Sequence, residues 1–241
     1  MQLKILSWNI WCGKYLDEVA DFLRKADADI IALQEVLENP DGTNIAQTIA
    51  KELGYECVFN IGMEMPAHFL NNPALAGRET VRFGNAILSK HKIVADRSHE
   101  LSLDEKRGVA EADIQIGENI LRAFSIHLKH THQTQMDVQD RQADRLAKML
   151  TEKKTIVMGD FNSLSESYPI EKMKSIMNDT EPDSATPTWS VYKDGCTICQ
   201  LDEVRHKLDY IFTSKDLKSS SFKVYDSKGS DHLPISAMIE I

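Results

Sequence analysis

Short apolar runs, rich in Val, Ile, Leu and Phe, alternate along the chain with stretches of helical periodicity. The short runs end at Gly, Asp, Asn or Ser, which is typical of strands in a globular domain. They predict strands at residues 3–10, 29–33, 55–61, 83–88, 109–116, 120–127, 155–159, 208–212 and 233–239. The middle of the chain has consecutive strands without an intervening helix, so a simple βαβ repeat does not fit. The pattern indicates an α/β fold with a mixed sheet arrangement and helices outside.

Three segments have apolar residues at the spacing of an amphipathic helix. The apolar positions are Leu16, Val19, Ala20 and Leu23 in the first segment, Ile45, Ile49 and Leu53 in the second, and Ala143, Leu146, Ala147 and Leu150 in the third. Residues 63–82 form the longest stretch without clear periodicity, and we expect a loop there. No internal repeat or low-complexity linker divides the chain, so we predict one domain over residues 1–241.

Composition narrows the class of protein. The chain has 241 residues, of which 42% are hydrophobic and 27% charged, and this balance excludes collagen-like, coiled-coil and disordered proteins. No apolar run approaches the roughly 18 residues that a membrane span needs, so we expect no stable membrane insertion. The first residues read as a strand rather than a secretory signal. We therefore expect a cytoplasmic protein, and a monomer.

The net charge of −9 comes from 28 Lys and Arg against 37 Asp and Glu. This sign is unfavourable for non-specific binding of a long polyanion, which depends on basic side chains neutralising phosphates. An acidic total does not exclude phosphate chemistry, however, because a bound metal ion can supply the positive charge locally.

The cysteines at positions 12, 57, 196 and 199 give no disulfide framework, since a chain of this length can bury its own core. Cys196 and Cys199 form a single C-x-x-C pair whose nearest histidine in the sequence is His206. We predict reduced, partly buried thiols and keep a zinc protein centred on this pair as the alternative. His130 and His132 are predicted to lie in the loop after a strand, facing solvent or at the rim of a cleft.

Acidic, amide and histidine side chains stand where apolar strands end. They are Asn9, Glu35, His127, Asp160, Asn162, Asp209, Asp231 and His232. Each one alone reads as a turn residue or a structural side chain. Together they indicate a site, because functional groups of α/β sheets collect beyond the strand ends. Carboxylate and amide oxygens with few cysteines nearby favour Mg²⁺ over zinc.

These residues lie in segments that resemble the endonuclease/exonuclease/phosphatase superfamily. The segments are Ser7-Trp8-Asn9, Leu33-Gln34-Glu35-Val36, Ile126-His127-Leu128, Gly159-Asp160-Phe161-Asn162, Leu208-Asp209-Tyr210-Ile211 and Ser230-Asp231-His232, and they occur in the family's order. The resemblance extends over nearly the whole chain. It implies a four-layer α/β sandwich, in which two mixed β-sheets pack face to face with helices outside.

The resemblance also implies roles in a metal-dependent phosphoester hydrolase. The metal, Mg²⁺ with Mn²⁺ as a substitute, would be held by Glu35, Asn9 and Asp231. Asp160 would activate the attacking water, and Asn162 would orient the water or the phosphate. Asp209 would orient His232 toward the phosphate, and His127 would contact the phosphate or help the leaving group.

The substrate stays open at this point. A phosphodiester, and thus nucleic acid, is the leading interpretation, while a phospholipid or a small phosphoester such as an inositol phosphate is the alternative. A histidine at position 127 resembles deoxyribonucleases, sphingomyelinases and bacterial members more than apurinic-site endonucleases. A catalytically silent binding module on the same fold is the remaining class, and the complete set of site residues argues against it.

Overall fold

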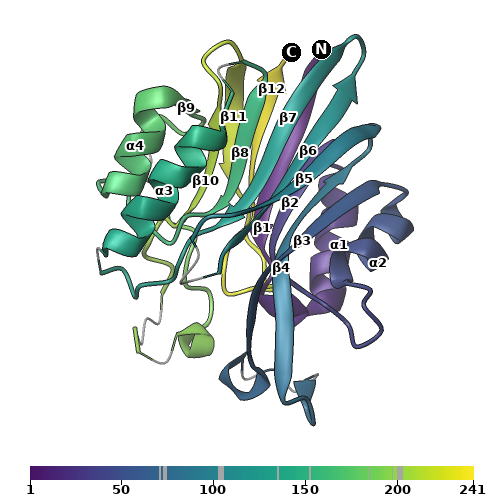
Figure 1. Cartoon of the computed structure of the whole chain (residues 1–241), viewed down its shortest axis with the longest axis vertical. Coiled ribbons are helices and arrows are strands. Elements are labelled where there is room, and N and C mark those ends of the chain that lie inside the picture. The colour runs from purple at the N-terminus through teal and green to yellow at the C-terminus, as the bar shows by residue number, and fades with distance from the viewer. Residues whose placement is uncertain are drawn as a thin grey trace.

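The computed structural model describes residues 1–70, 72, 75–102, 106–134, 136–151, 153–183, 185–196, 198–199 and 203–241. Two six-stranded mixed sheets form its centre (Figure 1). No helix in these ranges is long and apolar enough to cross a membrane.

The first sheet contains both ends of the chain. Its strands, in spatial order, are β11 (Lys218–Val224), β12 (Ile235–Glu240), β1 (Gln2–Asn9), β2 (Ile30–Leu37), β4 (Thr80–Ser89) and β3 (Glu56–Pro66). The two central strands, β1 and β2, are parallel, and Asn9 pairs with Gln34. Their carboxyl ends therefore meet at one edge of the sheet.

The second sheet repeats this arrangement. Its order is β5 (Ile93–Glu100), β6 (Gly108–Ile116), β7 (Asn119–His127), β8 (Thr155–Asp160), β10 (Asp209–Thr213) and β9 (Asn178–Asp179). Strands β7 and β8 are parallel, with His127 opposite Asp160. Strand β10 runs antiparallel to β8 and places Asp209 on the other side of Asp160.

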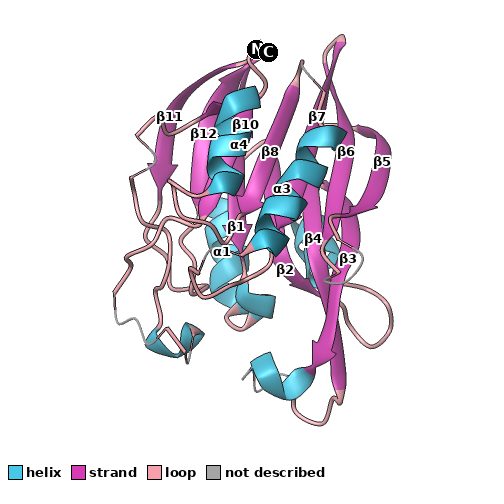
Figure 2. Ribbon diagram, turned by 60° about the vertical axis from the view of Figure 1, so that its left-hand side comes forward, coloured by secondary structure: helices cyan, strands magenta, loops and turns pink. Residues whose placement is uncertain are grey.

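Helices cover the outer faces, and apolar side chains fill the space between the sheets. Helices α1 (Leu16–Ala26) and α2 (Ile45–Leu53) pack on the first sheet, and α3 (Asp137–Met149) and α4 (Tyr168–Ile176) pack on the second (Figures 1 and 2). Ile5, Ala32, Ala112, Ile114 and Met158 belong to the core that joins the two sheets. This is a four-layer α/β sandwich, which confirms the predicted fold class.

The predicted elements agree with the structure where periodicity is strong. Helix α2 has the predicted bounds and begins with a capping box, in which the Asn44 side chain accepts from Gln47 N and the Gln47 side chain accepts from Asn44 N. Strands β5 and β11 and helix α4 were not predicted. The expected loop at residues 63–82 is partly wrong, since β3 continues to Pro66, the short 3₁₀ helix η2 covers Ala67–Leu70, and β4 begins at Thr80. Arg82 and Glu64 pair across this hairpin.

Candidate active site

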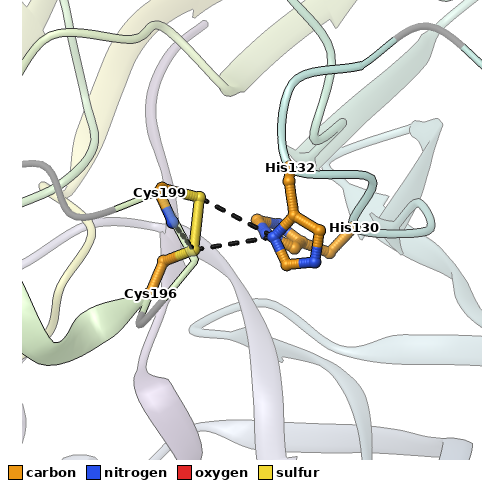
Figure 3. A group of neighbouring side chains, drawn as sticks. All are labelled: His130, His132, Cys196 and Cys199. Carbon is orange, nitrogen blue, oxygen red and sulfur yellow. Dashed lines mark hydrogen bonds between the residues drawn. A yellow bond between two sulfur atoms is a disulfide. The ribbon is translucent and has the colours of Figure 1, made fainter.

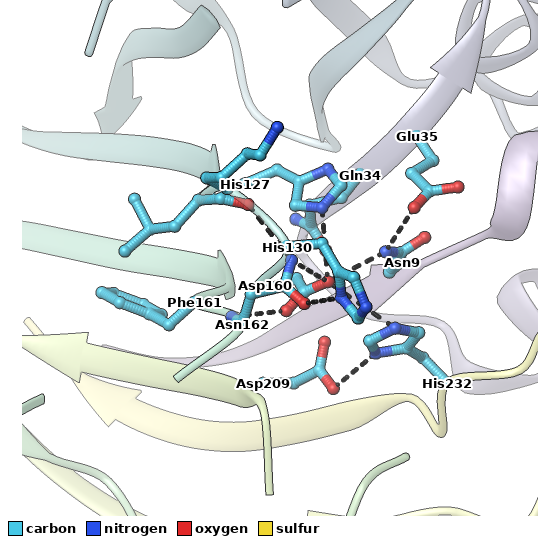
Figure 4. Close-up of polar contacts among 12 residues, drawn as sticks. Asn9, Gln34, Glu35, His127, His130, Asp160, Phe161, Asn162, Asp209 and His232 are labelled. Carbon is cyan, nitrogen blue, oxygen red and sulfur yellow. Dashed lines mark hydrogen bonds and ion pairs between the residues drawn. The ribbon is translucent and has the colours of Figure 1, made fainter. Parts of the chain in front are cut away.

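The predicted site residues come together at one edge of the sandwich, where the two pairs of parallel strands end (Figure 4). Asn9 and Glu35 come from the first sheet, whereas His127, Asp160 and Asp209 come from the second. Asp231 and His232 lie in the loop just before β12. The Gln34 side chain connects the sheets here, because its Nε2 donates to Ser125 Oγ of β7 at 3.1 Å.

Asp160 occupies the centre of the site. Its Oδ1 accepts a hydrogen bond from the backbone N–H of Asn162 at 2.8 Å. Its Oδ2 accepts from Asn9 Nδ2 at 3.1 Å and from Asn162 Nδ2 at 3.2 Å. The rings of His127 and His232 approach the same oxygen, with their Nε2 atoms at 3.5 and 3.6 Å. Nitrogen atoms from four separate segments thus converge on one carboxylate.

Burial raises the pKa of Asp160 to about 7, even though the charge of His232 acts in the opposite direction. The nearby Asp209 carboxylate also contributes to the increase. A carboxylate with a pKa near neutrality is a better proton acceptor than an ordinary aspartate, and retains a useful ionised fraction at pH 7.

His232 and Asp209 form a buried pair beside Asp160. His232 Nδ1 lies 2.9 Å from Asp209 Oδ2, while the other carboxylate oxygen, Oδ1, has no hydrogen-bond partner among the residues that the structure describes. Burial acts to lower the pKa of His232, but the charges of Asp209 and Asp160 outweigh it and raise that pKa well above its usual value. The ring is therefore a cation at neutral pH, with Nε2–H directed toward Asp160.

Glu35 owes its position to a break in the pairing of β2 with β4. The register shifts between Leu33 and Val36, and Glu35 has a φ of 54°, in the left-handed region. Such a bulge redirects a side chain at the rim of a sheet. Asn9 Nδ2 donates to Glu35 Oε1 at 3.1 Å, and the backbone N–H of Trp11 fixes the amide by donating to Asn9 Oδ1.

Two carboxylates lie close together at this end of the site, the partly buried Glu35 and the buried Asp231. Burial raises the pKa of Glu35, and the negative charge of Asp231 raises it further. Burial likewise raises the pKa of Asp231, although Trp189 Nε1 donates to its Oδ2 at 3.0 Å. Buried like charges of this kind require a cation to be stable in the ionised form. The carboxylates of Glu35 and Asp231 offer the oxygen ligands that Mg²⁺ prefers, so they fit a hard divalent cation. Asn9 Oδ1 accepts from Trp11 N–H and would have to share this oxygen with the ion.

A second set of candidate metal ligands lies within the same site. Asp160, Asp209 and His232 each offer an atom within 4.8 Å of the others. The hydrogen bond between His232 and Asp209 already engages two of these groups.

His127 ends β7 and is buried. Burial lowers its pKa well below the usual value, and the positive charges of Arg107 and His232 act in the same direction. The ring is therefore neutral at pH 7. It can donate or accept one hydrogen bond at Nε2, but it does not serve as a second imidazolium.

Three further residues lie at the site, and one of them, Cys12, was not predicted from the sequence. Cys12 donates its thiol proton to Glu35 Oε2 at 3.6 Å, and burial raises the pKa of that thiol well above its usual value. Trp189 contacts Asp231, and Arg107 is buried near His127. Cys12 follows Asn9 by three residues, and this closeness in the sequence is the one signal that could have identified it.

The prediction of reduced thiols at the C-x-x-C pair was wrong. Cys196 and Cys199 are joined by a disulfide, and their sulfur atoms lie 3.6 and 3.7 Å from His132 Nδ1 (Figure 3). Their histidine neighbour is thus His132 rather than His206. His132 is exposed as expected, but His130 is partly buried and reaches into the site, where its Nδ1 lies 2.7 Å from Asn162 Oδ1. Burial lowers the pKa of His130 to about 4.

Residues 6–232 match the Endonuclease/Exonuclease/phosphatase family. The chain belongs to this family. Its members are hydrolases that act on phosphoester bonds and generally use a divalent metal. The assignment agrees with the superfamily that the sequence motifs resemble. No curated protein matches the chain significantly in sequence.

Solved structures of endonuclease/exonuclease/phosphatase proteins share the fold. One from Beutenbergia cavernae has a TM-score of 0.78 at 16% identity and is matched over 100% of this chain and 72% of its own. One from Leptotrichia buccalis has a TM-score of 0.75 at 21% identity, over 99% of this chain and 100% of its own. The human Nocturnin catalytic domain with bound sulfate anion has a TM-score of 0.73 at 19% identity, over 99% and 93%. At these identities the likeness concerns the fold alone.

Proposed function

We propose that the protein is a Mg²⁺-dependent hydrolase that cleaves a phosphodiester by in-line attack of an activated water molecule. Mn²⁺ is proposed as a substitute for Mg²⁺. The observation that carries this proposal is the position of Asp160, a buried carboxylate with a pKa near 7 between a cationic His232 and the metal-ligand candidates Asn9 and Glu35. A base, a cation and an oxygen-rich metal site are the three groups that hydrolysis of a phosphoester needs.

The residues proposed to hold the ion are Glu35, Asn9 and Asp231. When bound, a divalent cation there polarises the phosphoryl oxygens and offsets the charge that develops during the reaction.

Asp160 is proposed to accept the proton of the attacking water. The backbone N–H of Asn162 and the amide of Asn9 hold the carboxylate in one orientation. This fixed orientation matters because a positioned base must lie within hydrogen-bond distance of the water in the reactive complex.

His232 is proposed to stabilise the negative charge on the phosphate through its Nε2–H. Asp209 keeps the ring charged and fixes its direction. His127, being neutral, is proposed to hold the phosphate or the leaving oxygen through a hydrogen bond rather than by charge.

For the substrate, nucleic acid is the leading proposal, with a short or single phosphodiester preferred over a long duplex. The net charge of −9 disfavours contact with a long polyanion along its length. The Nocturnin structure contains sulfate, a tetrahedral oxyanion of the same shape as phosphate, and thus agrees with oxyanion chemistry on this fold. Phospholipids and inositol phosphates remain the alternative.

The test is a panel of substrates assayed with Mg²⁺, with Mn²⁺ and with a chelator. It contains bis(p-nitrophenyl) phosphate, p-nitrophenyl phosphate, single- and double-stranded DNA, abasic DNA, RNA, sphingomyelin and inositol phosphates. We expect hydrolysis of diesters that the chelator abolishes and Asp160→Asn removes. Asp144→Asn is the matched control, because Asp144 is exposed on α3 and pairs only with surface groups among the contacts described.

Two results would refute the proposal. One is hydrolysis that persists in the chelator or in folded Asp160→Asn. The other is that no ester in the panel is hydrolysed with either metal. That result would favour the catalytically silent binding module.

A further inference from the structure

Two histidines and two cysteines lie close together beside the active site. In the sequence, 64 positions separate His132 from Cys196. His130 and His132 lie in the segment after β7, and Cys196 and Cys199 follow the short 3₁₀ helix η4 (Lys193–Gly195). One ligand atom from each residue lies within 4.8 Å of the other three (Figure 3). None of these four side chains is used in the proposed hydrolysis.

The hydrogen bonds of Asn162 determine which nitrogen of His130 is free. Asn162 Nδ2 donates to Leu128 O and to Asp160 Oδ2, so its Oδ1 is the atom that faces His130. An amide oxygen only accepts, and His130 Nδ1 must therefore carry the proton. The lone pair of His130 lies on Nε2, which points to His132 Nδ1 at 3.0 Å.

The hydrogen bond from His130 Nδ1 to Asn162 Oδ1 is typical of a metal-binding histidine. Such a ring usually donates its other N–H to a fixed oxygen, which sets both the tautomer and the ring direction.

The cysteines offer the remaining two ligands. The backbone N–H of Cys199 lies 3.0 Å from Cys196 Sγ and donates to it, which stabilises negative charge on that sulfur. Cys196 is 9% exposed and Cys199 is partly buried, so the site opens to solvent mainly on the side of the exposed His132.

We propose that, with its cysteines reduced, the chain binds one Zn²⁺ ion through His130 Nε2, His132 Nδ1, Cys196 Sγ and Cys199 Sγ. Zinc bonds of about 2.3 Å to sulfur and about 2.0–2.1 Å to nitrogen place tetrahedral S···N pairs about 3.6 Å apart and N···N pairs about 3.3 Å apart. The two sulfur atoms lie 3.6 and 3.7 Å from His132 Nδ1, and the two nitrogen atoms lie 3.0 Å apart. Binding of the ion therefore requires the two sulfur atoms to separate and the two nitrogen atoms to move apart by about 0.3 Å.

The disulfide in the structure is the oxidised form of the same ligand pair. Two equivalents of a thiol reductant convert it to two cysteine thiols and one reductant disulfide. Binding of Zn²⁺ then displaces one proton from each thiol, so that two protons leave as two Zn–S bonds form. Exchange of the two zinc-bound thiolates with an external disulfide, which takes up their two electrons and leaves as two thiols with two protons from solvent, restores the Cys196–Cys199 disulfide and releases the ion.

The proposed zinc site is distinct from the proposed Mg²⁺ site in ligand chemistry and in residues. It holds the segment that follows β7 against the segment that follows η4, at the rim of the active site. Through His130 it also fixes the amide of Asn162, which contacts Asp160.

The experiment measures metal content in the full-length chain. Protein purified with a phosphine reductant is dialysed, and zinc per chain is determined by mass spectrometry. We expect one zinc per chain, and expect the Co²⁺-substituted protein to show thiolate-to-cobalt charge-transfer absorption. The Cys196→Ser/Cys199→Ser variant should lose both signals, and His132→Ala, which alters an exposed side chain, should weaken binding at least tenfold.

Two controls separate this site from the rest of the molecule. Cys57→Ser replaces a free, half-buried cysteine elsewhere and should retain zinc. Glu35→Gln should also retain zinc. The zinc measurement therefore tests this site even if the proposed hydrolase activity is not found. The proposal is overturned if the reduced wild-type chain holds no stoichiometric zinc and gives no cobalt–thiolate absorption. It is equally overturned if the double cysteine variant keeps its zinc.

Discussion

The Nδ1 atom of His232 lies 2.9 Å from the Oδ2 atom of Asp209, and both side chains are buried. Asp209 lies at the first position of β10, directly opposite Asp160. The pair therefore places a cationic ring beside the carboxylate that is proposed to activate water. Its charge depends on Asp209, since burial alone would leave His232 neutral.

Replacing Asp209 by Asn should move the alkaline limb of the pH–rate profile to lower pH. Asp209 raises the pKa of His232, so its removal lowers that pKa and the imidazolium is lost earlier as the pH rises. We expect kcat at pH 7 to fall roughly 100-fold or more. Superimposable profiles for folded Asp209→Asn and wild type would contradict the assignment, and Asp144→Asn serves as the control.

Glu35→Gln should weaken binding of Mg²⁺ and Mn²⁺ by at least about tenfold, since even a change among residues that only support metal ligands costs about 10- to 100-fold in affinity. Titration calorimetry with Mn²⁺ measures this directly, without a substrate. Glu52→Gln, a change at an exposed position on α2, should bind as the wild type does. An unchanged affinity in Glu35→Gln would place the ion elsewhere, with Asp160 and Asp209 as the next ligands to test.

Metal removal should lower the free energy of unfolding. Glu35 and Asp231 repel each other when both are ionised and buried, and a ligand that binds only the folded chain stabilises it by about 2.7 kcal/mol at 100 times its Kd. Thermal unfolding with Mg²⁺ and with a chelator should therefore give a higher midpoint in Mg²⁺. The difference should disappear in Glu35→Gln. A difference of the same size in that variant would mean that the ion acts at another site.

Gly159→Ala should unfold the chain or strongly destabilise it. A Cβ at this position would lie 2.0 Å from the backbone oxygen of Ile126 on β7, so the two parallel strands would have to separate. The expected loss is about 3 kcal/mol or more. Gly117→Ala is the comparison, since nothing lies within 4 Å of its Cβ and only its φ of 59° opposes the change, at about 1 kcal/mol. Urea unfolding of the two variants compares them, and equal losses would contradict the steric argument.

A partly buried ion-pair network on β5, β6 and β7 should make stability depend on pH. Burial alone would raise the pKa of Asp113, but hydrogen bonds from Arg122 and Arg97 outweigh it and hold the pKa below its usual value. Stabilisation from Asp113 is thus present above the unfolded-state pKa of about 3.9 and is lost as the pH falls through the folded-state value.

Asp113→Asn should therefore cost about 2 kcal/mol at pH 7, where the hydrogen bonds to a charged group are lost. The gap to wild type should shrink as the pH falls below about 4. Urea unfolding between pH 3 and 7 measures the trend. Asp17→Asn, at an exposed position of α1, should show no comparable gap at any pH. A gap for Asp113→Asn that is constant over this range would exclude the linkage.

The sequence identified site residues that are charged or polar but directly follow apolar strands, where burial is unfavourable for such groups. Asp160 and Glu35 follow buried apolar strands, and parallel pairing then brings them to a common edge. Local patterns could not show the pairing of Cys196 with His132, because their contact depends on two loops that meet only in the folded chain. The same holds for Trp189, whose contact with Asp231 spans 42 positions. The amphipathic pattern of α4 is weak, so it was missed for a different reason.

The hydrogen bond from Gln34 to Ser125 joins the two sheets directly behind the site. Each sheet carries only part of the proposed site, so the spacing between the sheets sets the distance from the proposed metal ligands to Asp160, the proposed base. In the proposed mechanism, apolar residues between the sheets, such as Ala32 and Ala112, therefore act on the reaction through this spacing, without touching a substrate. Engineering of rate or substrate range in this protein can begin in its hydrophobic interior as well as at its loops.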